Sequence, residues 1–260
     1  MSAPGFETLR LAVSGPVGRL TLARPERLNA LNRQCLRELA EAAAWFDGQR
    51  DVHVVVVAGE GRAFCAGFDL ADFAGGDDGL PPRAGADLGR TMADAVGGMR
   101  AVTIAAVQGH CVGGGVVLVG CCDLRVAADD AVFSIPEVDL GIPLGWGGVP
   151  RLVRELGPAI AKELVMTCRP FDAAEARALR FVNRVVSRDR LEGEVDELAD
   201  SLTAKAPVVL EVTKRHMNAV AEEAGSTAHA FADADLIGGA LRDPSARAAA
   251  NRYLEAFRKR

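Results

Sequence analysis

The sequence lacks the features that mark several common protein classes. Its 260 residues carry a net charge of −5, so no overall positive field is present to hold nucleic acid or anionic lipid. No apolar run approaches the ~20 residues of a membrane-spanning helix, and the N-terminal segment "MSAPGFETLRL" has no basic stretch followed by an apolar one. We therefore expect no nucleic-acid partner, no membrane partner and a cytoplasmic location.

Motifs for disulfides, metals and nucleotides are also missing. The six cysteines form no CxxC pair and mostly have apolar neighbours, which predicts reduced, buried thiols. The four histidines show no ligand spacing, and neither a GxGxxG fingerprint nor a Walker A motif is found. The sequence thus predicts no metal site and no dinucleotide cofactor. The cysteines are Cys35, Cys65, Cys111, Cys121, Cys122 and Cys168.

Apolar residues, by contrast, are abundant at 49% of the chain, and several runs of them have the pattern of β-strands. The runs at 9–13 and 18–22 flank "SGPVG", which is typical of a hairpin. The nearly continuous apolar run at 52–59 predicts a strand buried on both faces, and further strands are expected at 102–107 and 124–128.

Helices and a loop separate these strands. Residues 32–46 carry apolar side chains along one stripe, which predicts a helix, and a second helix is expected over 88–99. The segment 73–87 is rich in Gly, Pro and Asp, which predicts an exposed loop. Strands that alternate with helices indicate an α/β fold.

The last part of the chain has a different pattern, mainly helical from about residue 150. Asp172 and Glu175 have capping-box spacing, and Asp243 precedes a proline at the start of another expected helix. Beyond about residue 202 no strand is expected. We therefore divide the chain into a core over residues 1–200 and a helical module over residues 201–260, which packs on its own core or on a neighbouring subunit.

Two glycine-containing stretches follow expected strands and begin expected helices. They are "GRAFCAGFDL" at 61–70, with Asp69 as a cap, and the triplet Gly113–Gly115. Backbone N–H groups in a first helical turn have no intrahelical acceptor. Donors that converge from two such junctions stabilise a carbonyl oxygen that gains negative charge. The alternative is that these glycines only permit tight turns and close packing.

Glu137 is the candidate acid–base residue. It follows a proline in the mainly apolar stretch 133–148, and apolar surroundings raise the pKa of a carboxylate toward the range of a general base. The alternative reading of a Pro–Glu pair is a solvated turn. Asp139 is expected to be a surface or capping group, and Trp146 a core residue or a pocket wall.

In combination these stretches resemble the crotonase superfamily, the enoyl-CoA hydratase/isomerase group. The similarity extends through "ARPERLNALN", "GRAFCAGFDL", "IAAVQGHCVGGG", "SIPEVDLGIP", "GGVPRLVRELG" and "FVNRVV", in family order. The resemblance implies a spiral of ββα units that carries the catalytic and CoA sites, followed by a helical module for oligomerisation. It also implies a homotrimer or a hexamer built as a dimer of trimers. The substrate would be an acyl-CoA thioester, so coenzyme A enters as part of the substrate and no separate cofactor is expected.

The resemblance also assigns roles to particular residues. The thioester oxygen would lie between the backbone N–H groups of Phe68 and Gly114, and Glu137 would move the proton. Coenzyme A would lie along two short segments of the chain. Its candidate contacts are Arg24, Arg27, Leu28, Ala66, Gly67 and Asp69.

Val117 is a departure from the hydratase pattern. Hydratases of this family carry a second glutamate at the position of Val117, and valine cannot transfer a proton. Glu137 alone suffices to shift a double bond, so the resemblance favours a Δ3,Δ2-enoyl-CoA isomerase. Dienoyl-CoA isomerase and aryl-CoA dehalogenase activities are disfavoured, because the aspartate they use would fall near Gly145. A weak hydratase, or one with a different second acid–base group, and a non-catalytic acyl-CoA-binding protein stay open as alternatives.

Overall fold

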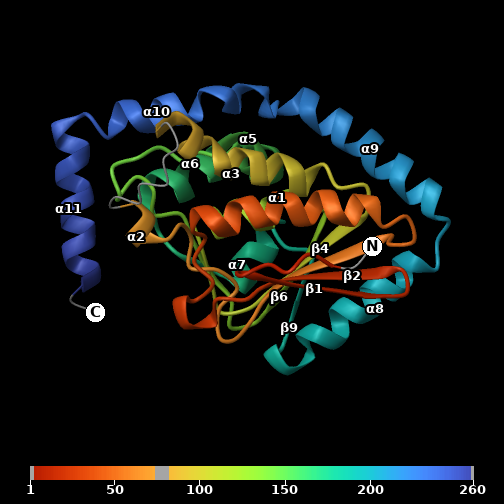
Figure 1. Cartoon of the computed structure of the whole chain (residues 1–260). Helices are drawn as coiled ribbons and strands as arrows, with labels where there is room; N and C mark the ends of the chain where they lie inside the picture. Colours follow the sequence, from red (N-terminus) through yellow and green to blue (C-terminus); the bar gives the residue numbers. More distant parts are fainter. Residues whose placement is uncertain (1–2, 74–81, 259–260) are drawn as a thin grey trace.

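The computed structural model describes residues 3–73 and 82–258. A six-stranded sheet forms its centre, with helices on both faces, and the C-terminal helices run along the outer side (Figure 1). None of the helices in these two ranges is both long and apolar enough to cross a bilayer.

The main sheet has the strand order β1-β2-β3-β4-β6-β9. β1 and β2 pair in antiparallel fashion around Gly15, and all other neighbours are parallel. The predicted hairpin and the strands expected near residues 54, 102 and 124 are confirmed. The bounds are β1 Leu9–Ser14, β2 Val17–Leu22, β3 Val54–Gly59, β4 Val102–Val107, β6 Leu124–Ala128 and β9 Arg184–Val186.

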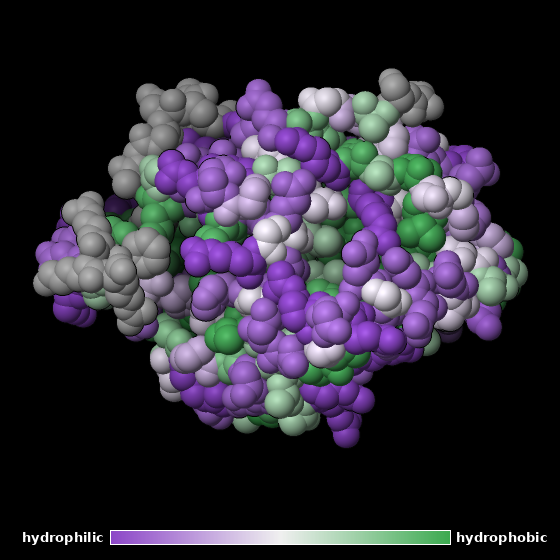
Figure 2. Space-filling view, turned by 90° about the horizontal axis from the view of Figure 1, so that it is seen from below, coloured by the Kyte–Doolittle hydropathy of each residue, from purple (hydrophilic) through white to green (hydrophobic). Residues whose placement is uncertain are grey.

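β3 is buried on both faces, as its continuous apolar run predicted, and so is β4. On one face alternate side chains such as Val55 and Ala105 join the larger core under α1 and α3. On the other face Val54 and Ile104 pack against α8 (Leu191–Thr203). Seen from the side of α8, the surface is mainly polar with scattered apolar patches (Figure 2). The sheet is therefore the inner layer between two helical layers.

A second, three-stranded sheet lies beside the main one and has the order β5-β7-β8. Its strands are short, with β5 at His110–Val112, β7 at Val132–Ser134 and β8 at Phe171–Asp172. β5 leads directly into α4 (Gly114–Cys121), so this sheet fixes the point at which the glycine triplet begins a helix.

One boundary prediction is wrong. The exposed loop expected over 73–87 is helical from Pro82 onward, because α3 runs Pro82–Gly97 and packs along α1. The Gly- and Pro-rich composition suggested a loop, but a proline at a first helical position favours a helix start, and tertiary packing outweighs weak propensity. Residues 74–81 of that expected loop lie outside the described residues, and Phe73 ends α2.

The other helices follow the expected pattern. Asn32 caps α1 by accepting a hydrogen bond from the Cys35 N–H at 2.8 Å, and Asp172 caps α7 through the Glu175 N–H at 2.8 Å. The bounds are α1 Arg33–Gly48, α2 Leu70–Phe73, α5 Gly148–Leu156, α6 Pro158–Thr167 and α7 Ala173–Ala178, with short 3-10 turns at Pro25–Arg27 and Arg188–Arg190.

Past α8 the described chain is helical only. α9 extends over the outside of the molecule, and α10 and α11 follow along the edge at which α2 and α3 lie (Figure 1). The proposed division at residues 200 and 201 falls within α8, and the two-part organisation stays a proposal. The bounds are α9 Pro207–Ala224, a 3-10 segment Thr227–Ala232, α10 Asp233–Ala240 and α11 Pro244–Arg258.

Candidate active site

The first junction of the candidate site is the start of α4. Gly113 has φ +51°, a left-handed value that favours glycine, and its N–H donates to the Ser134 carbonyl at 2.8 Å. A Cβ atom at residue 113 would lie 2.6 Å from Oε1 of Glu137. Bare backbone is therefore required here so that the Glu137 carboxylate can lie against the helix start.

The second junction runs beside the first. The Cys65 N–H donates to the His110 carbonyl at 3.0 Å, and the Val112 N–H donates to the Cys65 carbonyl at 2.9 Å. Gly67 has φ +89°, and a Cβ atom there would lie 2.9 Å from the Val112 carbonyl oxygen. The backbone of the 65–69 segment is thus held against the residues that lead into α4.

Phe68 and Gly114 each present a backbone N–H that donates to no acceptor among residues 3–73 and 82–258. Both residues also contact Trp146. The Phe68 and Trp146 ring centroids lie 5.8 Å apart at 85°, and a Cβ atom at residue 114 would lie 2.3 Å from the Trp146 ring. The structure therefore brings the two amide donors into one neighbourhood.

Glu137 follows β7 and reaches back to the start of α4. Its Oε2 atom is buried and accepts no hydrogen bond from the residues that the structure describes. Burial raises the pKa of Glu137 from 4.5 to about 7, and its own backbone N–H offsets part of this effect. The apolar surroundings seen in the sequence predicted this direction. Near neutral pH the group is available as both acid and base.

Val117 lies one turn into α4 and is buried. Its N–H donates to the Gly113 carbonyl at 3.1 Å, and its side chain packs close to Gly148 at the start of α5. The position at which the family's hydratases carry a glutamate is therefore an apolar contact between two helices.

The candidate CoA contacts come from two segments that the structure joins. The Ala66 N–H donates to the Leu28 carbonyl at 2.9 Å, and the Leu31 N–H to the Gly67 carbonyl at 2.8 Å. Leu28 has a left-handed φ of 51°. Their role in binding coenzyme A stays a prediction, but the two segments lie side by side and are joined by hydrogen bonds.

The two arginines of this region differ. Arg24 forms an ion pair with Asp69 at 3.0 Å and also donates to the Ala30 carbonyl. Arg24 and Asp69 therefore both have a structural role. Asp69 accepts a hydrogen bond from the Ala71 N–H as well, as predicted for a helix cap. Arg27 is exposed and has no ion-pair partner in the described part of the chain, which leaves its guanidinium available to an anion.

Asn29 is a residue that sequence reasoning missed. It is buried, with φ of +57°, and its Oδ1 accepts a hydrogen bond from the Arg24 N–H at 3.0 Å. Its Nδ2 donates to the Glu60 and Ala63 carbonyls, both at 2.9 Å. Asn tolerates the left-handed region, which was the available signal. Its side chain ties the 24–30 turn to the segment that leads to Phe68.

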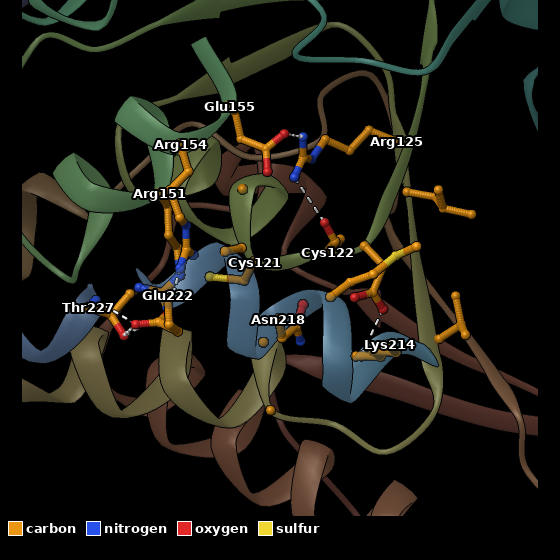
Figure 3. A pocket seen from close by; sticks show the side chains of 18 of the residues that line it. Cys121, Cys122, Arg125, Arg151, Arg154, Glu155, Lys214, Asn218, Glu222 and Thr227 are labelled. Atoms are coloured by element: carbon orange, nitrogen blue, oxygen red, sulfur yellow. Dashed lines mark hydrogen bonds and ion pairs between the residues drawn. The ribbon is translucent and has the colours of Figure 1, made fainter. Parts of the chain in front are cut away.

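A cavity of about 600 Å³ lies at the other end of α4, under α9 (Figure 3). Its basic side chains are each paired with a carboxylate, so it offers no unpaired charge to a ligand, and neither Glu137 nor the two amide donors line it. The pairs are Arg125–Glu155 at 2.8 Å, Arg151–Asp94 at 3.2 Å, Arg154–Glu222 at 2.5 Å and Lys214–Asp123 at 2.7 Å.

The cysteines are free thiols, and all except Cys168 are buried, as predicted. Burial raises the pKa of Cys35 to about 11 and that of Cys65 to about 12. Such thiols stay protonated and are poor nucleophiles near neutral pH. Cys35 and Cys65 therefore serve as buried packing groups beside the two junctions.

Comparisons with known proteins agree with this geometry. The family model for enoyl-CoA hydratase/isomerase matches residues 13–259. A probable enoyl-CoA hydratase of Rhizobium meliloti is 41% identical over 207 residues, 76% of each chain. A peroxisomal Δ(3,5)-Δ(2,4)-dienoyl-CoA isomerase of Arabidopsis thaliana is 34% identical over 223 residues, 80% of each chain. The crystal structure of an enoyl-CoA hydratase from Bacillus anthracis superposes with a TM-score of 0.78 at 31% identity, covering 82% of this chain and 83% of that one.

The fold and the paired junctions thus define a crotonase-type α/β protein, as the sequence predicted. Within that superfamily, the chain belongs to the enoyl-CoA hydratase/isomerase family of enzymes.

Proposed function

We propose that this enzyme is a Δ3,Δ2-enoyl-CoA isomerase that uses Glu137 as its single acid–base group. The observation that carries the proposal is the contrast between two positions beside the glycine triplet. Glu137 is a buried carboxyl group with a raised pKa, whereas the second glutamate position of the hydratases is the buried, apolar Val117. One carboxylate is enough to move a double bond but leaves hydration without its second proton-transfer group.

The reaction begins with proton removal. The Glu137 carboxylate takes a proton from C2 of a 3-enoyl thioester, and the electron pair of the broken C–H bond forms the C1–C2 double bond of a dienolate. The carbonyl π electrons move to the thioester oxygen, which becomes an oxyanion. A pKa of about 7 keeps a large fraction of Glu137 ionised at neutral pH and makes the protonated form a competent acid for the return step.

The second step returns the same proton. The neutral Glu137 carboxyl donates it to C4, a double bond forms between C2 and C3, and the carbonyl is restored. The oxyanion is held meanwhile by the N–H groups of Phe68 and Gly114, which have no other acceptor in the described chain. Each such donor is worth about 3–4 kcal/mol. Neither oxidant nor co-reactant is required.

The proposed substrate is an acyl-CoA thioester, held along the joined segments 24–28 and 66–69. Arg27 is the residue whose charge is free to meet a phosphate of coenzyme A. Leu28, Ala66 and Gly67 belong to the same joined segments and are proposed neighbours of coenzyme A.

Assembly as a homotrimer or a dimer of trimers is part of the proposal. The described chain exposes a row of large apolar side chains from α9 to the end of α10, and such surface is commonly covered by another subunit. The row comprises Val208, Val209, Val212, Met217, Val220, Phe231, Leu236 and Leu241.

Enoyl-CoA hydration is the second candidate function. It is favoured by the names of the relatives, since the Rhizobium meliloti and Bacillus anthracis proteins are both described as hydratases. The dienoyl-CoA isomerase activity of the Arabidopsis relative receives less support, because Gly145 is buried against Ile237 and carries no acid group.

A substrate panel tests the proposal. Purified enzyme is assayed with 3-hexenoyl-CoA for isomerisation and with crotonyl-CoA for hydration. We expect isomerisation to have the higher kcat/KM. Faster hydration of crotonyl-CoA would reverse the assignment, and thioester binding with no turnover of either substrate would indicate a non-catalytic acyl-CoA-binding protein.

A further inference from the structure

Trp146 follows the loop that carries Glu137 and has a conformation that a tryptophan seldom adopts. Its φ is +60°, in the left-handed region, which is unfavourable for a residue other than glycine. Surrounding contacts hold this turn in place. Arg151 donates to the Gly147 carbonyl at 3.1 Å, and the Gly147 N–H donates to Oδ2 of Asp233 at 2.8 Å. These hydrogen bonds fix the backbone of the turn, and the indole lies against Gly114 and Phe68.

The indole fills the space between two helices. A Cβ atom at Gly89, in the middle of α3, would lie 2.0 Å from its Cδ2 and Cε2 atoms. A Cβ atom at Gly114, the first residue of α4, would lie 2.3 Å from its Cζ3 atom. Glycine inside a helix lowers the stability of that helix relative to alanine. The contact therefore explains the glycine at position 89, since a side chain there would overlap with the indole.

The indole also borders the reacting groups. It covers Gly114, whose N–H is a proposed oxyanion donor, and meets the ring of Phe68, the other donor, edge to face at 5.8 Å. Glu137 lies against the adjacent Gly113. A thioester whose oxygen binds both amides and whose C2 faces Glu137 must therefore extend its acyl carbons along the indole.

We propose that Trp146 forms the end wall of the acyl pocket and restricts this enzyme to short-chain acyl-CoA thioesters. The inference rests on the proposed function, because it takes the acyl-CoA thioester as the ligand of this site. The wall is held in place, since the half-buried indole packs between α3, α4 and the Phe68 ring, and its backbone turn is anchored by Arg151 and Asp233. A longer chain has to displace the indole.

Chain-length kinetics test the wall. The kcat/KM values of the wild type, Trp146→Ala and Trp146→Phe are measured with 3-butenoyl-, 3-hexenoyl- and 3-decenoyl-CoA. In Trp146→Ala we expect the ratio of the 3-decenoyl to the 3-hexenoyl value to rise by about tenfold or more, as for pocket contacts with several methylenes. We expect the ratio for Trp146→Phe to lie between the ratios for the wild type and Trp146→Ala. The control is Trp45→Ala, since Trp45 packs on Phe46 of α1 and its removal leaves the chain-length profile unchanged. An unchanged ratio in both Trp146 variants would overturn the proposal.

Fluorescence provides a readout that needs no turnover and no destabilising change at residue 146. The chain has two tryptophans, so Trp45→Phe leaves Trp146 as the sole tryptophan. Hexanoyl-CoA, which has no double bond to move, is titrated against free coenzyme A. We expect the thioester to shift the Trp146 emission and coenzyme A alone to have a much smaller effect. No shift at saturating hexanoyl-CoA would overturn the wall, whereas a shift without isomerase activity would retain the wall and reject only the proposed reaction.

Discussion

The two ends of α4 differ in how their polar groups are satisfied. At the N-terminal end, the Glu137 Oε2 atom and the N–H groups of Phe68 and Gly114 have no partner among residues 3–73 and 82–258. At the C-terminal end, the buried side chain of Arg125 donates to Glu155 and to the carbonyls of Val119, Cys122 and Phe181. Unpaired buried polar groups are costly, so their concentration at one end marks the place where a ligand is expected to supply the partners.

This difference separates the proposed reactive site at one end of a helix of eight residues from a structural site at the other end. The C-terminal end lines a cavity of about 600 Å³, yet the basic side chains of that cavity are each paired with a carboxylate. The presence of a cavity alone would therefore have pointed to the end of α4 at which the charges are already paired. Variants at each end of α4 test this difference separately.

The largest effect is expected at the N-terminal end. Glu137→Gln keeps the shape of the side chain but cannot accept the C2 proton, so we expect isomerase turnover to fall by about 10²–10⁴-fold. Binding of hexanoyl-CoA, measured by calorimetry, is expected to persist. Wild-type turnover in this variant would remove Glu137 from the mechanism.

The opposite end is tested with Arg125→Met. The change leaves three backbone carbonyls and Glu155 without their donor, so we expect a loss of about 3 kcal/mol in the free energy of unfolding. The accompanying fall in Tm is about 10 °C. The kcat of the folded variant, measured well below its Tm, is expected to stay at the wild-type value. Lost turnover with an unchanged Tm would show that this end belongs to the reactive site.

The pH dependence of stability sharpens the contrast further. Burial raises the pKa of Glu137 from 4.5 in the unfolded chain to about 7 in the folded one, so the folded state retains the proton longer. The resulting stabilisation is complete below pH 4.5 and is lost as the pH rises toward 7. We expect Glu137→Gln and the wild type to be equally stable at pH 4, and the variant to be more stable by up to about 3 kcal/mol at pH 8.

Urea unfolding at both pH values measures this difference, and the other titrating groups cancel in the comparison of the two proteins. A lower free energy of unfolding for Glu137→Gln than for the wild type at pH 8 would show that the carboxylate has a partner in the folded state.

The smallest effect is expected at the exposed Arg27. Arg27→Ala removes a charge that has no ion-pair partner in the described chain, so we expect an increase of a few-fold in the KM for the CoA thioester, with kcat and Tm unchanged. The matched control is Arg50→Ala, also exposed but located past the far end of α1. An equal change in KM for both variants would indicate a nonspecific charge effect.

Local sequence pattern predicted much of the fold. The hairpin, the strand at 52–59 that is buried on both faces and the caps at Asp69 and Asp172 each depend on neighbouring residues, and all are present. The start of α3 at Pro82 was missed because its composition is typical of a loop, while its packing on α1 depends on distant residues.

The candidate site was likewise predictable only where it depends on residues that are close in the sequence. The apolar stretch around Glu137 indicated a raised pKa, and burial does raise it. No local sequence pattern indicated the contact of Trp146 with Gly89, which joins residues far apart in the chain. The ion pair between Arg125 and Glu155 depends in the same way on how β6 and α5 meet.

Site-specific titration of Glu137 tests the central claim most directly. ¹³C-glutamate-labelled wild type and Glu137→Gln are followed by NMR across pH 4 to 9, and the signal that is absent from the variant is assigned to the Glu137 carboxyl. We expect that signal to titrate with a midpoint near 7. A midpoint near the ordinary value of 4.5 would show a solvated carboxylate and contradict the account of a single buried acid–base group.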